Sequence, residues 1–155
     1  MKTAEEILKE KNRDIISVPY STKIIDALKV MNENKIGAIL VKKDDQIIGI
    51  WTERDLLRNT LIEGFIPNSA IIGDYMNTGL QSAPHTSTIY NLMDKFLGKR
   101  LRHLLIEKDG KYIGLLSAGD VSKAQLADKT EELTKLNAMV GWEYYENWRW
   151  KGDKE

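Results

Sequence analysis

The sequence predicts an α/β protein of the α+β kind, in which two β-α-β-β-α repeats pack as a pseudo-symmetric pair and a helical extension follows. Two observations lead to this prediction. The segment GIWTERD at residues 49–55 has a counterpart, GLLSAGD, 65 positions later at residues 114–120. With the same offset, residues 17–56 align with residues 82–121 without a gap. Self-similarity over this length indicates a duplicated supersecondary unit.

Identical residues are spread over the whole alignment. They include the pairs Ser17/Ser82, Pro19/Pro84, Ile24/Ile89, Leu40/Leu105, Lys43/Lys108, Asp44/Asp109, Ile48/Ile113, Gly49/Gly114 and Asp55/Asp120. One unit of about 55 to 60 residues is small for burying a core alone, whereas two packed together are sufficient. We therefore expect the two repeats to pack together as one domain.

Each repeat begins with a short strand and a helix. In the first repeat Ile15 and Ile16 form the expected strand, which stops at Pro19. Ser21 or Thr22 is suited to cap the helix that follows. The apolar residues of this helix fall at helical spacing, at Ile24, Ala27, Leu28 and Met31.

A β-hairpin and a second helix complete the repeat. The continuous apolar run GAILVKK, residues 37–43, predicts a strand buried on both faces. A turn at Asp44-Asp45 leads to the strand QIIGIW, and Thr52 opens the last helix. In the second repeat the dipeptide Asp109-Gly110 is a strong hairpin signal.

The repeats are joined by residues 61–76, which Gly64 and Pro67 interrupt. At the end of this connection IIGDYM predicts a short helix that matches AEEILKE at the start of the chain. The predicted boundaries are 9–68 for the first repeat, 74–130 for the second and 131–155 for the extension.

Composition restricts the function. Lys plus Arg and Asp plus Glu both number 23, so the formal charge is zero and a nucleic-acid partner is not expected. The longest apolar run, IGAILV, is far shorter than the about 20 residues that span a bilayer. No cysteine is present, and the charged start MKTAEEILKEKNRD has no apolar core for a secretory signal. We expect a cytoplasmic protein with no membrane partner.

The duplicated motif has two interpretations. Thr52 followed by Asp55, like Ser117 followed by Asp120, resembles a helix capping box. Alternatively, free amides and the dipole at a helix N-terminus suit a phosphate, to which the hydroxyl adds a donor. The aspartate one turn further offers the acceptors that hold a ribose diol. The occurrence of the motif at equivalent places in both repeats favours a nucleotide site.

Catalysis is not expected. The two histidines, His85 and His103, occupy different repeat positions, and no metalloprotease motif, nucleophile elbow or glycine-rich phosphate loop occurs. The histidines also lack the spacing of metal ligands, so we expect neither a metal site nor a catalytic cofactor.

The chain resembles a pair of CBS domains, the cystathionine-β-synthase-type regulatory repeat, over about residues 1 to 130. Both GIWTERD and GLLSAGD satisfy the family pattern glycine, apolar, any residue, Ser or Thr, two residues, Asp. RHLLIEKDGKYIG, residues 102–114, also resembles the usual hairpin of the second repeat.

This resemblance implies a stand-alone regulatory module with two clefts for adenine nucleotides, AMP, ADP or ATP. Ribose would bind Asp55 and Asp120, and phosphate would lie near Thr52 and Ser117. The implied adenine contacts are Ile16, Val18, Ile36, Gly37, Ala38, Ala83 and Leu101 to Leu104, and we assign Leu101 and Leu104 among the last of these. S-adenosylmethionine or NAD as ligand, or interaction without a nucleotide, remain the alternatives.

Charged residues differ between the repeats. Arg54 lies inside the first motif and is a candidate phosphate ligand, whereas Gly119 takes its place in the second. Arg102 and His103 replace the Gly37-Ala38 dipeptide of the first repeat. We therefore expect Arg54 to serve one phosphate site and Arg102 with His103 to serve the other.

The last residues predict an interaction surface. Leu126, Leu133, Leu136 and Val140 form an apolar stripe on a helix that outlasts the repeat. Three of the four tryptophans follow, in GWEYYENWRWKGDKE. Together with the association of CBS pairs into dimers, this predicts a homodimer held in part by residues 131–155. The alternative is an unidentified protein partner at this extension.

Overall fold

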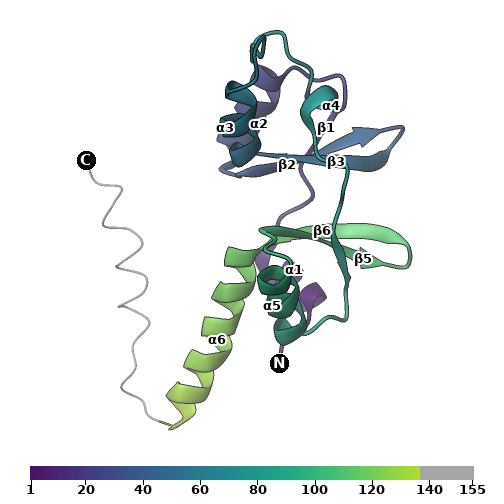
Figure 1. Ribbon diagram of the computed structural model, residues 1–155. Helices are drawn as coiled ribbons and strands as arrows, with labels where there is room; N and C mark the ends of the chain where they lie inside the picture. Colours follow the sequence, from purple (N-terminus) through teal and green to yellow (C-terminus); the bar gives the residue numbers. More distant parts are fainter. Residues whose placement is uncertain (137–155) are drawn as a thin grey trace, which may run out of the picture.

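Two halves of the chain fold into similar units that lie one above the other (Figure 1). The computed structural model describes the backbone of residues 1–136 and the side chains of residues 1–132. The first half contains β1 (Ser17–Pro19), α2 (Ile24–Asn34), β2 (Ala38–Lys43), β3 (Gln46–Thr52) and α3 (Glu53–Thr60). The second half contains β4 (Ser82–Pro84), α5 (Ile89–Gly98), β5 (His103–Lys108), β6 (Lys111–Ser117) and α6 (Ala118–Leu136). The predicted fold class and the paired β-α-β-β-α repeats are confirmed.

Each half has a three-stranded sheet of the same topology, with the orders β1-β2-β3 and β4-β5-β6. The first two strands run parallel and the last two antiparallel. Ser17 lies opposite Leu40 in the first sheet, and Ser82 opposite Leu105 in the second. The register shifts between Val41 and Lys42 and again between Ile106 and Glu107, 65 positions later. The irregularity in the strand pairing thus occurs at equivalent positions in the two repeats.

Both predicted hairpin turns are present. The central residues have positive φ in each, at 51° and 61° for Asp44 and Asp45 and at 51° and 75° for Asp109 and Gly110. Positive φ at both central positions is typical of the tight turns whose twist matches that of the flanking strands. Asp tolerates this conformation better than most residues other than glycine, which explains how Asp44-Asp45 serves where the second repeat has Asp109-Gly110.

The central strands β2 and β5 each contribute buried residues to one of two hydrophobic cores. Residues 38–41 of β2 are all buried, as the continuous apolar run predicts. Trp51 is fully buried in the first core, and its indole Nε1 donates a hydrogen bond of 2.8 Å to Asn59 Oδ1. The second core gathers around Leu104, Ile106 and Leu116. Burial of these strands fixes the relative position of each strand-to-helix junction.

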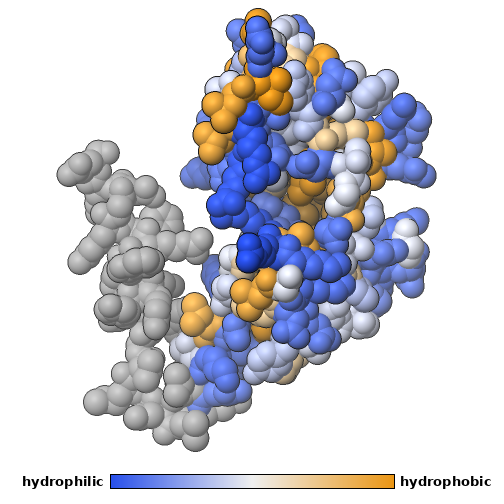
Figure 2. All heavy atoms as spheres, viewed as in Figure 1, coloured by the Kyte–Doolittle hydropathy of each residue, from blue (hydrophilic) through white to orange (hydrophobic). Residues whose placement is uncertain are grey.

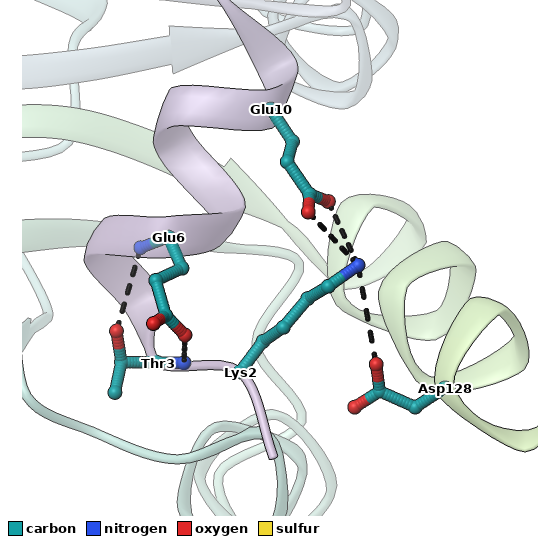
Figure 3. A network of polar contacts seen from close by, with 5 residues as sticks. All are labelled: Lys2, Thr3, Glu6, Glu10 and Asp128. Carbon is teal, nitrogen blue, oxygen red and sulfur yellow. Dashed lines mark hydrogen bonds and ion pairs between the residues drawn. The ribbon is translucent and has the colours of Figure 1, made fainter. Parts of the chain in front are cut away.

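Both predicted short helices are present. The helix near the start of the chain packs on the second half, and the helix between the repeats packs on the first half. Ile7 of α1 (Ala4–Lys11) belongs to the second core, and Ile72 of α4 (Ile72–Tyr75) belongs to the first. At the start of α1, Thr3 and Glu6 form a capping box, while Lys2 Nζ lies 2.9 Å from Glu10 Oε1 and 3.9 Å from Asp128 Oδ1 (Figure 3). Of these contacts, the one between Lys2 and Asp128 links the start of α1 to α6.

The glycine of each motif is required by this helix packing. A Cβ added to Gly49 would lie 2.5 Å from Met76 Sδ, and one added to Gly114 would lie 2.5 Å from Leu8 Cδ2. Such distances are too short for a carbon without movement of the neighbour. The glycines therefore permit a close approach of the end of α4 to the first hairpin and of α1 to the second.

Two local predictions were wrong. The first strand is Ser17–Pro19 rather than Ile15–Ile16; the Ile16 carbonyl still accepts the Leu40 amide at 3.2 Å, at the edge of the ladder. The cap of α2 is Lys23, without a side-chain hydrogen bond, rather than Ser21 or Thr22.

The cap is replaced by distant backbone. The amides of Ile24 and Ile25 donate to the carbonyls of Ala70 and Pro67, at 2.8 and 3.0 Å. These bonds satisfy donors that a capping side chain would otherwise take. The connection between the repeats thus performs the function of the N-cap.

Helix α6 continues past the second repeat to Leu136, and Leu126 on it is 46% exposed. The rest of the predicted leucine stripe and the aromatic segment, including Val140 and Trp142, lies outside the described side chains. The predicted boundaries 9–68, 74–130 and 131–155 stay predictions. Over the described part of the chain, no helix combines the length and hydrophobicity that crossing a bilayer requires.

Candidate functional site

The first motif forms the junction between β3 and α3. Thr52 is the N-cap of α3, and its Oγ1 accepts the Asp55 amide at 3.3 Å. In return Asp55 Oδ2 accepts the Thr52 amide at 2.9 Å and the Thr52 hydroxyl at 3.0 Å. The capping box is thus formed in full, and it orients the aspartate toward the space between the halves.

The second motif has the same geometry. Ser117 Oγ accepts the Asp120 amide at 3.0 Å, and Asp120 Oδ2 accepts the Ser117 amide at 2.8 Å. The first amide of the helix is also bonded alike in both halves. Glu53 N–H donates to the Gly37 carbonyl at 3.0 Å, and Ala118 N–H donates to the Arg102 carbonyl at 2.9 Å. Of the first three amides of α3, only that of Arg54 has no hydrogen bond to the described residues.

The two aspartates differ in their third partner. Asn77 Nδ2 donates to Asp55 Oδ2 at 2.9 Å, whereas Lys11 Nζ donates to Asp120 Oδ2 at 2.8 Å. Burial alone would raise the pKa of Asp120, but the hydrogen bonds from Lys11 and Ser117 outweigh it and lower that pKa below its ordinary value. One aspartate is held by a neutral amide and the other by a cation.

A cavity of about 310 Å³ opens beside Asp55, between the two halves. Its walls come from the start of α3, from the segment between α4 and β4, and from the loop that enters β5. We call this cavity the main cleft. Figure 2 shows strongly hydrophilic residues gathered at the level where the halves meet. The residues of the main cleft that bear charge or titrate are Glu53, Arg54, Asp55, Arg58, Arg100, Arg102 and His103.

The arginines of the main cleft are not neutralised. None of Arg54, Arg58, Arg100 and Arg102 makes an ion pair or a side-chain hydrogen bond within the described residues. Guanidinium groups keep their charge at all physiological pH values and bind phosphate in a bidentate manner. Two of them come from each half of the chain. The cleft therefore combines four arginines that make no ion pair among the described residues with the carboxylates of Glu53 and Asp55.

His103 lies between this cleft and the second motif. Burial is the largest cause that lowers its pKa below the ordinary value, and the nearby charges of Lys11 and Arg102 lower it further. The carboxylates of Asp120 and Glu53 act in the opposite direction but do not outweigh these causes. The imidazole is accordingly neutral at neutral pH in the absence of a ligand.

A second, much smaller cavity of about 40 Å³ lies beside β2 and the segment that leads into β1. We call it the second cleft. It is lined mainly by apolar side chains, with charged groups at one end. Its lining residues are Lys11, Arg13, Asp14, Ile15, Ile16, Ile36, Ala38, Leu40 and Leu115.

The two cavities occupy related positions in the repeat. Adding 65 to Ile15, Ile36 and Leu40 gives Leu80, Leu101 and Leu105, which line the main cleft. The same shift converts Asp14 into Gly79 and Ala38 into His103. The chain thus builds the same kind of cleft twice, with different side chains.

The predicted site residues are distributed unequally. The main cleft brings together Thr52, Arg54, Asp55, Gly37, Leu101, Arg102 and His103. Ile16, Ile36 and Ala38 line the second cleft, while Val18, Ala83 and Leu104 are buried in the cores and line neither cavity. Ser117 and Asp120 also line neither of the two clefts.

The structure does not separate the predicted cations into two cavities. The sequence predicted that Arg54 serves one site and Arg102 with His103 the other, yet all three line the main cleft. The reason is that the start of α3 faces the loop before β5, so motif residues of one half meet strand-entry residues of the other.

Several residues of these sites were missed, among them Arg58, Asn77, Arg100 and Lys11. Arg58 follows Arg54 by one helical turn, and this spacing could have indicated it. Asn77 is 65 positions after Asn12, so extending the alignment would have marked it. Arg100 and Lys11 gave no such signal, because each depends on how distant segments pack.

Comparisons with known proteins agree with this architecture. A family model described as CBS domain matches residues 4–61 and again residues 72–127. The mitochondrial CBS domain-containing protein CBSX3 of Arabidopsis thaliana is 35% identical over 123 residues, which cover 76% of this chain and 59% of that protein. The uncharacterized protein MK0525 of Methanopyrus kandleri is 27% identical, with coverages of 80% and 66%. The chain spans less than two thirds of the length of these curated relatives.

Solved structures of similar fold include the CBS-domain containing protein ATU1752 from Agrobacterium tumefaciens, with a TM-score of 0.75, 32% identity and coverage of 80% of this chain and 99% of that one. CBSX2 in complex with AMP has a TM-score of 0.67 at 24% identity and covers 83% and 99%. CBS-domain proteins are regulatory. With two tandem matches that cover most of its length, this chain belongs to the CBS-domain family.

Proposed function

We propose that the protein is a non-catalytic regulatory module that binds an adenine nucleotide in the main cleft and signals by a change of conformation or assembly. The observation that carries the proposal is the set of four arginines, without carboxylate partners among the described residues, around a cavity of about 310 Å³. Bringing uncompensated cations together is unfavourable unless an anion neutralises them. A phosphate ligand does so.

The remaining parts of a nucleotide also have candidate partners. All hydrogen bonds to the Asp55 carboxylate from the described residues fall on Oδ2, so Oδ1 is available to a ribose hydroxyl. The apolar side chains of Leu80, Leu101 and Leu105 line the same cavity and suit a base. The phosphate would meet Arg54, Arg102 and the Thr52 hydroxyl, with AMP, ADP and ATP as candidates.

The charge of the cleft argues against S-adenosylmethionine. Its sulfonium is a cation and would have to lie among four guanidinium groups. AMP is the ligand named for CBSX2, whose likeness to this chain is one of fold. The ligand is therefore inferred from the charges of this cleft rather than from that structure.

Thermal unfolding in the presence of AMP, ADP, ATP, NAD and S-adenosylmethionine tests the proposal. A ligand at 100 times its dissociation constant stabilises the folded protein by about 2.7 kcal/mol. We expect this stabilisation with at least one adenine nucleotide and none with S-adenosylmethionine. The absence of any shift with every nucleotide would favour the alternative, an interaction module without a nucleotide.

We further propose that the protein acts in the cytoplasm as a homodimer held in part by its C-terminal extension. Support comes from the leucine spacing of the sequence and from Leu126, which is exposed on α6. Sedimentation of the full chain and of a chain that ends at residue 130 tests this. Equal association of both would show that the extension serves another partner or only its own fold.

A further inference from the structure

Lys11 links the first helix to the second motif across a sequence separation of 109 residues. Its Nζ donates to Asp120 Oδ2 at 2.8 Å and to the Leu115 carbonyl at 3.0 Å. Both side chains of the ion pair are only 26% exposed. The ammonium therefore lies against the one motif carboxylate that lines neither cleft.

We infer that Lys11 fills the ribose position of the second cleft and thereby restricts nucleotide binding to the main cleft. This inference rests on the proposed function, since it concerns which of two equivalent sites the nucleotide uses. It assigns to Lys11 the role of a residue that determines stoichiometry.

The cavities support this role. Asp55 lines the main cleft directly, whereas Asp120 does not line the second cleft. Asp120 instead lines a separate groove between α1 and α6, and Lys11 lines both that groove and the second cleft. The lysine thus stands between the apolar slot and the carboxylate. A ligand cannot reach both until the lysine side chain leaves.

The backbone that carries Lys11 is held firmly in place. Glu5 pairs with Lys108 at 2.7 Å, Ile7 is 4% exposed in the second core, and Leu8 packs against Gly114. At the opposite end of the helix, Lys2 lies 3.9 Å from Asp128 of α6 and also pairs with Glu10 of α1 itself (Figure 3). Moving α1 away would break its contacts with Lys108, with the second core and with Gly114, so rotation of the Lys11 side chain is the simpler way to open the site.

The second cleft also offers a phosphate fewer guanidinium groups, because one arginine, Arg13, is among its described lining residues, against four in the main cleft. The positions that correspond to Arg54, Arg102 and His103 are Gly119, Gly37 and Ala38. A nucleotide would have to break a charged hydrogen bond at Asp120 without gaining the guanidinium contacts of the main cleft. The pKa of Asp120, which lies below its ordinary value, keeps its carboxylate ionised at neutral pH.

Calorimetric titration of the full chain with ATP, AMP and ADP tests the inference. We expect one nucleotide per chain for the unmodified protein. Lys11→Met removes the ammonium, keeps an apolar stem of similar length and should give a second, weaker binding event. Lys9→Met is the matched control, because Lys9 lies exposed on the same helix, and it should leave one site.

Each outcome decides the point. Two nucleotides per chain in the unmodified protein, or one per chain in a folded Lys11→Met variant, would overturn the inference while leaving the proposed function intact. Binding of none of the three nucleotides to any variant would refute both. If Lys11→Met does not fold, Lys11→Gln keeps a hydrogen-bond donor without the charge, and the stoichiometry of the unmodified protein remains decisive by itself.

Discussion

The main cleft and the second cleft are made from equivalent parts of two repeats, yet they differ in charge and in size. Asp55 is held by the neutral Asn77 beside a cavity of about 310 Å³. Asp120 is held by Lys11 and lines a groove of about 400 Å³ between α1 and α6, apart from the second cleft, which measures about 40 Å³. The hydrogen bonds of the two capping boxes are almost the same. The shared part is therefore the scaffold, and the difference lies in the side chains around it.

This comparison separates two roles of the duplicated motif. Its glycine, hydroxyl and aspartate serve the fold, by close packing at Gly49 and Gly114 and by capping α3 and α6. These roles are filled in both halves whether or not a ligand can enter. Discrimination between ligands instead depends on residues at or beyond the motif, such as Arg54, Arg102 and Lys11.

The largest expected effect comes from the cations of the main cleft. Arg54→Ala and Arg102→Ala should each weaken nucleotide binding, because a hydrogen bond to a charged group contributes about 1.5–3 kcal/mol, a factor of roughly 10 to 150. Lys123→Ala is the control, since Lys123 is exposed beside Asp120 and takes the position that Arg58 has in the first repeat. If calorimetry gave equal nucleotide affinities for all three variants, the main cleft would be excluded as the phosphate site.

An intermediate effect separates the two aspartates. Asp55→Asn should lower nucleotide affinity by about tenfold, because it replaces a charged acceptor for ribose by a neutral one. Asp120→Asn should instead lower the free energy of unfolding by about 1 kcal/mol, through loss of a partly buried ion pair and a charged cap.

The stability difference for Asp120 should depend on pH in a definite direction. The pKa of Asp120 in the folded protein lies below its ordinary value. Its contribution to the free energy of unfolding is therefore fully present above the pKa of the unfolded chain and is lost as the pH falls through the pKa of the folded protein. Denaturant unfolding of the unmodified chain and of Asp120→Asn should differ at neutral pH and converge in acid. A difference that persists unchanged to the lowest pH would contradict the assignment of the ion pair.

The smallest expected effect is a change of affinity with pH, of a few fold. Burial lowers the pKa of His103 in the free protein, and a bound phosphate would raise it by favouring the charged imidazole. Affinity should then rise as pH falls through the pKa of the complex and level off below the lower pKa of the free protein. Nucleotide titrations of the unmodified protein and of His103→Gln between pH 5 and 8 test this. The affinity of the variant should change less with pH.

Local signals allowed much of the fold to be predicted. The hairpin dipeptides, the buried run of residues 37–43 and the cap at Thr52 each act within a few residues, and the repeat supplied the pairing of the halves. The cap of α2 could not be predicted, because backbone carbonyls at residues 67 and 70 replace it. Likewise, nothing in the local sequence indicates that Lys11 bonds to Asp120.

The candidate site was predicted in part for the same reason. The motif residues Thr52 and Asp55 were identified from their own spacing. Which cleft Arg102 and His103 enter depends on the facing of α3 and the loop before β5, which is a property of tertiary packing. The offset of 65 residues indicates this placement only when it is used to compare the lining of the two cavities, and not when it is used to compare the two repeats.

A crystal structure of the full chain grown with ATP, ADP or AMP would test the central claim most directly. The account predicts nucleotide density in the main cleft, with phosphate against Arg54 and Arg102, ribose at Asp55 Oδ1, and Lys11 still bonded to Asp120. A nucleotide bound at Asp120 with the main cleft empty would contradict it.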